Sequence, residues 1–178
     1  MPTWRYKAAM ALIVRPSGYA FWKAVRMRCA LGRSGISATK TEGDGVTPSG
    51  LYSFREIFYR ADRVAKPDTS LPCRAIDPTD GWCDDPKDAR YNQPVTLPFD
   101  GSHEILMRDD GLYDVVVVLG YNDDPVKAGL GSAIFLHVAA PGFAPTEGCV
   151  ALARDDLVAL VAEIQPDDVI DIRLSDDP

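Results

Sequence analysis

The alternation of hydrophobic and polar positions predicts a chain built mostly of short β-strands. Runs rich in valine, isoleucine, leucine and aromatic residues are separated by turns that contain Gly, Pro or Asp. These runs predict strands at residues 4–14, 21–31, 51–58, 104–108, 114–121, 133–138 and 169–174.

Near the end of the chain the period changes from that of a strand to that of a helix. Apolar residues recur there at the three- and four-residue spacing that places side chains on one helix face, at Leu157, Leu160, Val161 and Ile164. Asp155 and Asp156 suit the first turn, where the helix dipole favours negative charge, and Pro166 ends the helix. We expect this helix to pack against the sheet that carries Cys149.

The segment 62–100 has little periodicity and many Pro and Asp residues. A stretch of this length inside a compact domain is either an ordered insertion that covers a site as a lid or a passive surface loop. It contains Cys73 and Cys83, which would form a disulfide in an exported protein. We favour two free thiols.

Length and composition limit the classes of protein. A chain of 178 residues with 46% hydrophobic residues is long enough for one packed domain and too short for two ordinary ones. The net charge of −7, with scattered Lys and Arg, argues against a nucleic-acid partner, which requires a basic stripe. No run approaches the roughly 18 apolar residues that span a bilayer. We expect one domain over residues 1–178 that crosses no membrane.

The first residues combine a basic start at 1–7 with an apolar run at 8–14. Arg15 and Pro16 end the run, and no small-residue cleavage site follows. We interpret this segment as a first strand and not as a signal peptide.

His137 and Cys149 are the candidates for chemistry, as a base and a thiol nucleophile. A free thiol titrates near pH ~8.5, so it needs an imidazole, a cation or a local dipole to lower its pKa. The apolar run 134–136 can hold the imidazole at a strand end, and a Pro- and Gly-containing turn at 141–145 can bring the thiol to it. Gly148 would let the backbone approach a substrate carbonyl and leave amides free for an oxyanion hole.

The alternative for both residues is structural. Cysteines are more often buried apolar residues than nucleophiles, and a histidine that closes a strand is more often a hydrogen-bonded structural group. The chain has two histidines and no CxxC pair, so a closed zinc site is not expected. We expect no metal and no organic cofactor.

Two separated motifs resemble the YkuD-type L,D-transpeptidases. His137 and the Thr-Glu-Gly-Cys-Val box at 146–150 are similar to the family's histidine and its Ser/Thr-x-Gly-Cys-Ile/Val box at this distance. Upstream, the stretch 40–50 is similar to the family's Lys…Gly-x-x-Thr-Pro-x-Gly hairpin. The segments 120–122 and 131–137 resemble the strand that delivers the histidine, so the resemblance extends over most of the chain.

The resemblance implies a fold and an activity. The implied fold is mainly β, a β-sandwich of mixed sheets with Cys149 and His137 at one end, to which this chain adds one late helix and a long insertion. The implied activity joins peptidoglycan stem peptides, in cell-wall biogenesis and the control of cell shape. Cys149, deprotonated by His137, attacks a donor stem peptide, and the thioester passes to an acceptor amine, that of diaminopimelate in the family. A backbone carbonyl would orient the imidazole.

The box departs from the family's common Ser-His-Gly-Cys-Ile/Val-Arg form at three positions. Thr146 replaces serine, Glu147 replaces histidine, and Ala151 stands where the arginine usually is. That arginine could grip a substrate carboxylate bidentately, so we expect Arg154 or Arg108 to substitute for it. The form resembles a divergent branch associated with cross-links from L-Ala, giving 1,3 links, and not from diaminopimelate, giving 3,3 links. Both donors stay open.

Further side chains are candidates for binding the substrate together with Thr146 and Glu147. Candidates for binding stem-peptide carbonyls near the histidine strand are Tyr113, Tyr121 and Asn122, whose alternative role is to hydrogen-bond strand ends. In the insertion, Trp82 with Tyr91 and Asn92 would line a groove for a sugar–peptide polymer, or Trp82 would be a packing anchor.

Two other functions fit the same residues. Release of the thioester to water would make the protein an L,D-carboxypeptidase or amidase, and a structural Cys149 would make it a non-catalytic peptidoglycan-binding module. A peptidoglycan substrate implies the periplasm or cell envelope, whereas the lack of a recognisable signal peptide leaves the cytoplasm as the alternative.

Overall fold

The computed structural model describes residues 9–177 and is mainly β, with one α-helix in that range. The strands are β1 (Ala11–Arg15), β2 (Tyr19–Trp22), β3 (Val25–Ala30), β4 (Ile36–Ser37), β5 (Thr47–Pro48), β6 (Gly50–Tyr59), β7 (Cys73–Ala75), β8 (Asp80–Cys83), β9 (Pro94–Thr96), β10 (His103–Ile105), β11 (Val115–Leu119), β12 (Phe135–Val138), β13 (Val150–Leu152) and β14 (Val169–Ile172). A short 3₁₀ turn, η1 (Pro141–Phe143), precedes β13, and α1 (Arg154–Glu163) follows it.

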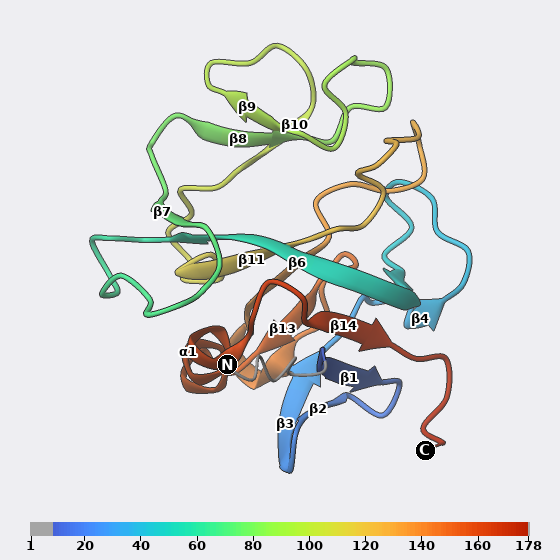
Figure 1. Cartoon of the computed structure of the whole chain (residues 1–178). Coiled ribbons are helices and arrows are strands. Elements are labelled where there is room, and N and C mark those ends of the chain that lie inside the picture. Colours follow the sequence, from blue (N-terminus) through green and yellow to red (C-terminus); the bar gives the residue numbers. More distant parts are fainter. Residues whose placement is uncertain (1–8, 178) are drawn as a thin grey trace, which may run out of the picture.

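Nine strands form one mixed sheet that closes on itself, in the order β11-β12-β13-β3-β2-β1-β14-β6-β7 with a further pairing of β6 with β11 (Figure 1). The long strand β6 makes the closure: residues 50–53 pair with β14, and residues 54–59 pair with β11. The ladder between β6 and β11 shifts its register between Val117 and Leu119, an irregularity of the kind that increases strand twist. The predicted mainly β class is confirmed, but the sheet is barrel-like and not a plain sandwich.

The predicted helix is confirmed as α1. Its buried side chains are Leu157, Leu160 and Val161, and they join the core cluster between the helix and the closed sheet. Asp155 and Asp156 occupy its first turn, as expected from the helix dipole. The helix packs against β11 and β12, so it supports the strand that carries His137.

All seven predicted strands have somewhat different bounds in the structure, and three of them differ most. The run predicted at 21–31 is a hairpin of β2 and β3, because Lys23 and Ala24 form a tight turn without the Gly, Asn or Asp that usually marks one. The strand predicted at 104–108 already ends at Ile105. The first strand begins at Ala11, and residues 4–8 of that prediction lie outside the described residues.

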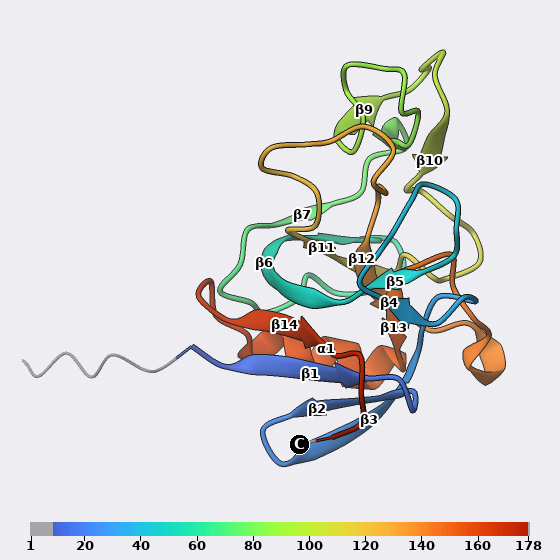
Figure 2. The same ribbon diagram turned by 90° about the vertical axis from the view of Figure 1, so that its right-hand side faces the viewer.

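The insertion 62–100 is ordered and carries structure of its own. Strands β8 and β9 form a three-stranded sheet with β10, which lies at the end of the molecule away from β1 to β3 (Figures 1 and 2). Cys73 and Cys83 are free thiols in this structure.

Asn92 connects this insertion to the segment that leads into β12. Its Oδ1 accepts hydrogen bonds from Trp82 Nε1 and from the amide of Ala133, both at 3.0 Å. Its Nδ2 donates to the carbonyls of Tyr121 and Asn122, at 3.0 and 2.8 Å. The insertion therefore braces the histidine strand.

The three residues of the expected polymer-binding groove, Trp82, Tyr91 and Asn92, are all buried, which favours the alternative role of Trp82 as a packing anchor. Trp82 packs edge-on against Phe135 with ring centroids 5.1 Å apart. The Tyr91 hydroxyl donates to Glu42 and accepts from the Gly131 amide. Packing and internal hydrogen bonds occupy the groups that a polymer would need.

We expect Asn92→Ala to lower the free energy of unfolding by about 2 kcal/mol or more, because two buried donors, Trp82 Nε1 and the Ala133 amide, lose their acceptor. Urea denaturation followed by tryptophan fluorescence measures the change. Gln93→Ala is the matched control, since the neighbouring side chain is exposed. Equal stability of the two variants would show that the brace contributes nothing.

Candidate active site

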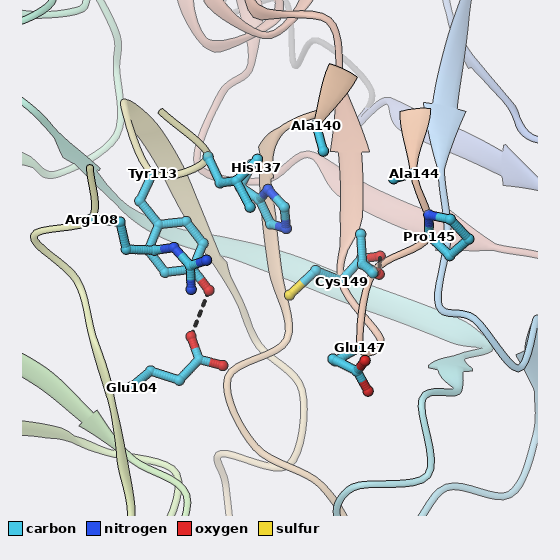
Figure 3. A pocket seen from close by; sticks show the side chains of 11 residues that line it. Glu104, Arg108, Tyr113, His137, Ala140, Ala144, Pro145, Glu147 and Cys149 are labelled. Atoms are coloured by element: carbon cyan, nitrogen blue, oxygen red, sulfur yellow. Dashed lines mark hydrogen bonds between the residues drawn. The ribbon is translucent and has the colours of Figure 1, made fainter. Parts of the chain in front are cut away.

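The register of two parallel strands places His137 and Cys149 on one face of the sheet. In the β12–β13 ladder His137 is the partner of Ala151, and Leu136 is the partner of Val150. Alternate residues of an extended chain face the same side, so Cys149, two positions before Ala151, faces the side of His137. Leu136 and Val150 face the core cluster that contains α1. Both candidate side chains project into the same space (Figure 3).

A backbone carbonyl holds the imidazole. His137 Nδ1 lies 2.9 Å from the Val138 carbonyl oxygen, which can only accept, so Nδ1 carries the proton and Nε2 carries the lone pair. The Tyr113 ring packs edge-on against the imidazole with centroids 5.4 Å apart. Burial lowers the pKa of His137 to about 4, so the ring is neutral near pH 7.

Two backbone groups hold the thiol. Cys149 Sγ accepts from the Phe135 amide at 3.3 Å and donates to the Ala133 carbonyl at 3.2 Å. Burial, together with the nearby Glu104 carboxylate, raises the pKa of the Cys149 thiol to about 12. Burial thus opposes the lowered thiol pKa that the sequence led us to expect, and it favours a neutral thiol and a neutral imidazole in the resting site.

The loop before Cys149 is organised by Thr146. Its Oγ1 accepts from the Gly148 amide at 3.1 Å and donates to the Cys149 carbonyl at 2.6 Å. Gly148 has φ +140°, and a Cβ at this position would lie 2.7 Å from the Val46 carbonyl oxygen, so only glycine fits. In this state the Gly148 amide is hydrogen-bonded to Thr146 and is not free for an oxyanion.

Two cavities adjoin the thiol. The first, of about 190 Å³, contains His137, Arg108, Tyr113 and Thr146 in its wall, and we call it the histidine cavity. The second, of about 220 Å³, has a wall that includes Lys40, Glu42, Asp84 and Ser132, and we call it the acidic cavity. Glu104, Glu147 and Cys149 line both cavities.

Comparison with protein families gives one match that covers nearly the whole chain. The model of YkuD, the L,D-transpeptidase catalytic domain, matches residues 8–172. The chain belongs to this family. YkuD enzymes act on peptidoglycan and are typically associated with the cell envelope. No curated protein and no solved structure matches the chain.

Four of the predicted binding residues of this YkuD domain line the histidine cavity: Arg108, Tyr113, Thr146 and Glu147. Arg108 bonds to Asp110 and lies over the Tyr113 ring, 5.1 Å from its centroid. Glu147 is exposed and bonds to Arg33 at 2.9 Å. Of the two candidates to replace the arginine missing at Ala151, only Arg108 is at the site.

Three other predicted residues line neither cavity of the YkuD domain. Arg154 bonds to the Arg63 carbonyl and lies 3.6 Å from Asp114. The Tyr121 hydroxyl donates to the Leu130 carbonyl, and the Asn122 amide closes the loop that follows it. All three side chains hold backbone in place, which for Tyr121 and Asn122 is the structural role that we gave as the alternative.

Among the described residues no helix is long and apolar enough to cross a membrane.

Glu104 is the site residue that sequence reasoning missed. Its Oε2 accepts from the Tyr113 hydroxyl at 2.5 Å (Figure 3). Burial raises the pKa of Glu104, and the carboxylates of Asp84 and Glu42 raise it further. No motif marks this glutamate, because the pairing of β10 with β8 in the small sheet brings it to the site.

We expect alkylation of Cys149 by iodoacetamide to be slow near pH 7 and to rise up to pH 10 without levelling, because the folded thiol has a pKa of about 12. Peptide mapping by mass spectrometry follows Cys149 separately from the other three thiols. In urea the same peptide should react at half its maximal rate near pH ~8.5, the pKa of a free thiol, and level above that pH. Levelling below pH 9 in the folded protein would contradict a neutral resting thiol.

Proposed function

We propose that this YkuD domain is a cysteine-dependent L,D-transpeptidase that joins peptidoglycan stem peptides through a thioester on Cys149. The observation that carries the proposal is the placement of His137 and Cys149 on one sheet face, in the wall of one cavity. The imidazole presents an Nε2 lone pair because Nδ1 is committed to the Val138 carbonyl.

The neutral resting pair sets the order of the first steps. As Sγ attacks the carbonyl carbon of a donor stem peptide, His137 Nε2 takes the thiol proton, so no buried thiolate has to exist beforehand. The thiol gives up its hydrogen bond to Ala133 at this point. The imidazolium then donates the proton to the leaving amine as its bond to carbon breaks, which leaves a thioester and a neutral imidazole.

Transfer repeats the same proton movements in reverse. An acceptor amine attacks the thioester carbonyl, His137 takes one proton from the nitrogen, and the thiol is released with that proton. We assign stabilisation of the oxyanion to the Cys149 amide, because Thr146 occupies the Gly148 amide. Lys40 adds a positive potential: its Nζ lies 3.3 Å from the position that a Cβ on Gly148 would take.

Arg108 is our candidate for gripping a substrate carboxylate in the histidine cavity. It lies beside Tyr113 in the cavity wall, whereas Ala151 cannot take the role of the family's arginine. The substrate is a muropeptide, and its donor residue is diaminopimelate for 3,3 links or L-Ala for 1,3 links. Water in place of the acceptor amine would make the same site an L,D-carboxypeptidase or amidase.

One observation favours a second function, a non-catalytic peptidoglycan-binding module. Cys149 is only 8% exposed, and its sulfur is hydrogen-bonded on both sides to backbone. A structural cysteine has these properties. The presence of His137 in the same cavity wall favours the enzyme, because a structural cysteine needs no base beside it.

We expect cross-linked dimers when the purified protein is incubated with defined muropeptides and the products are analysed by mass spectrometry. Cys149→Ala should give none, and His137→Gln should lower the rate by about 10²-fold or more, since general base catalysis contributes 10²–10⁴-fold. Fragmentation of the dimers identifies the donor residue.

The remaining outcomes separate the alternatives. Trimmed monomers without dimers would identify a hydrolase. Unchanged muropeptides with both the intact protein and Cys149→Ala would favour the binding module.

A further inference from the structure

Three arginines near the start of the chain have no carboxylate partner. Every other arginine within residues 9–177 forms an ion pair with Asp or Glu. Arg15, Arg26 and Arg28 form none with a described residue, although the chain has more acidic than basic side chains. The unpaired guanidinium groups of the described chain therefore belong to one region.

Strand register places these arginines on the outer face of β1, β2 and β3. Arg15 of β1 is the partner of Tyr19 of β2, and Tyr19 is the partner of Arg28 of β3. In the next row Phe21 of β2 is the partner of Arg26. Directly paired residues share a face, and the alternate positions of all three strands belong to the core cluster. We call the outer side, formed by these five residues, the arginine face.

Aromatic rings of the arginine face hold two of the guanidinium groups. Arg15 lies 5.0 Å from the centroid of the Phe21 ring, and Arg26 lies 4.9 Å from that of Tyr19. Arg15 also donates one hydrogen bond to the Asp176 carbonyl. Stacking uses the flat side of a guanidinium and leaves N–H groups at its edge for an anion. A stacked arginine also has less side-chain freedom to lose when it binds.

The third arginine connects the face to the loop between β12 and β13. The Arg28 guanidinium lies 4.5 Å from the centroid of the Phe143 ring and donates to the Gly142 carbonyl at 3.3 Å. Ala140 and Ala144, on either side of η1, line the histidine cavity. The arginine face therefore adjoins the loop that forms part of the wall of this cavity.

Acidic side chains near the edges of the arginine face already have partners. Asp171, on the neighbouring strand β14, is ion-paired with Arg173 at 2.8 Å. The Asp176 carboxylate accepts a backbone amide at 3.2 Å. At the turn between β2 and β3, Glu163 is ion-paired with Lys23 at 2.5 Å. The three arginines thus remain available to an anion from outside the chain.

We propose that the arginine face binds the surface of a membrane that contains anionic phospholipids. A bilayer presents its phosphates as a two-dimensional array, and the guanidinium groups are spread in the same way over β1 and β3. Between them lie the rings of Tyr19 and Phe21, a type of side chain that favours the level of the lipid headgroups. The charge and the aromatic rings therefore fit one partner.

A polyanionic chain fits this face less well than a bilayer does. Proteins that bind such a chain align their cations along a groove, whereas these arginines spread across three strands. The net charge of −7 means that other parts of the surface would repel a long polyanion. A bilayer contacts one face only, so it avoids most of this repulsion.

Binding through the arginine face is independent of the proposed reaction. Strands β1 to β3 lie at the end of the molecule away from the small sheet of β8, β9 and β10 (Figures 1 and 2). Neither His137 nor Cys149 belongs to the face, so Cys149→Ala should bind a membrane as tightly as the intact protein. Failure of the proposed function would leave the membrane proposal standing, and the reverse also holds.

Vesicle flotation measures the binding. We expect the intact protein to float with vesicles of equal parts phosphatidylglycerol and phosphatidylcholine, and not with phosphatidylcholine alone. Arg26→Gln/Arg28→Gln should bind the anionic vesicles about 20-fold more weakly, since each arginine contributes about fivefold. Added salt should weaken the binding of the intact protein, because it screens the attraction.

Arg90→Gln is the matched control. Arg90 is exposed and stacks on Phe99, 4.4 Å from the ring centroid, but it lies in the insertion. Its substitution removes the same charge and the same kind of stack, and it should leave vesicle binding unchanged. Arg26→Gln alone, with an expected loss of about fivefold, is the second variant should the double variant not fold.

Three results would overturn the membrane proposal. The first is equal flotation of the intact protein with neutral and anionic vesicles, or flotation with neither. The second is a loss of binding in Arg90→Gln as large as that in Arg26→Gln. The third is binding to inorganic polyphosphate that depends on Arg26 and Arg28, without binding to vesicles, which would assign the arginine face to a polyanionic chain.

Discussion

The parallel pairing of β12 with β13 is the constraint on which the site depends. Side chains two residues apart on a strand share a face. The pairing of His137 with Ala151 therefore places Cys149, two residues before Ala151, on the face of His137. A slip of one residue would turn His137 into the core cluster and expose Leu136. Burial of Leu136 and Val150 against α1 opposes this slip, and hydrophobic packing thereby fixes the geometry of the polar pair.

The burial that holds His137 and Cys149 in place also favours the uncharged form of both side chains. The resting His137 and Cys149 are both neutral, because a thiolate and an imidazolium in this environment would lose more hydration than they recover from each other. The Ala133 carbonyl and Phe135 amide give the thiol a stable resting position. The proposed reaction then requires substrate in the cavity, since only a forming bond to carbon can draw the proton from sulfur to nitrogen. An idle thiol of this kind is protected from oxidation and alkylation.

Short sequence patterns predict the elements whose formation depends mainly on residues close together in the chain. The helical spacing at Leu157 and Leu160 and the apolar run before His137 were sufficient for α1 and β12. Closure of the sheet could not be predicted from such patterns, because it depends on the pairing of β6 with β11 and β14, two strands distant in sequence. Arg108, Tyr113, Thr146 and Glu147 were predicted near the site, while Tyr121, Asn122, Arg154 and Trp82 serve the backbone and the core. Glu104 was missed because an isolated glutamate in a short strand carries no signal until β8 and β10 pair.

The two cavities beside Cys149 have walls from different parts of the chain, and the insertion 62–100 contributes only to the acidic cavity. The closed sheet positions His137 and Cys149, and the turn before β13 supplies Thr146, so the histidine cavity has the parts that the proposed reaction uses. The small sheet of β8, β9 and β10 stands over the other side, and Asn92 ties it to the segment whose Ala133 carbonyl holds the thiol. Glu104, on β10 of this small sheet, thus lines both cavities together with Cys149 without belonging to the strands that position the thiol. Substitutions in the small sheet can therefore change the cavity walls while the closed sheet keeps His137 and Cys149 in place.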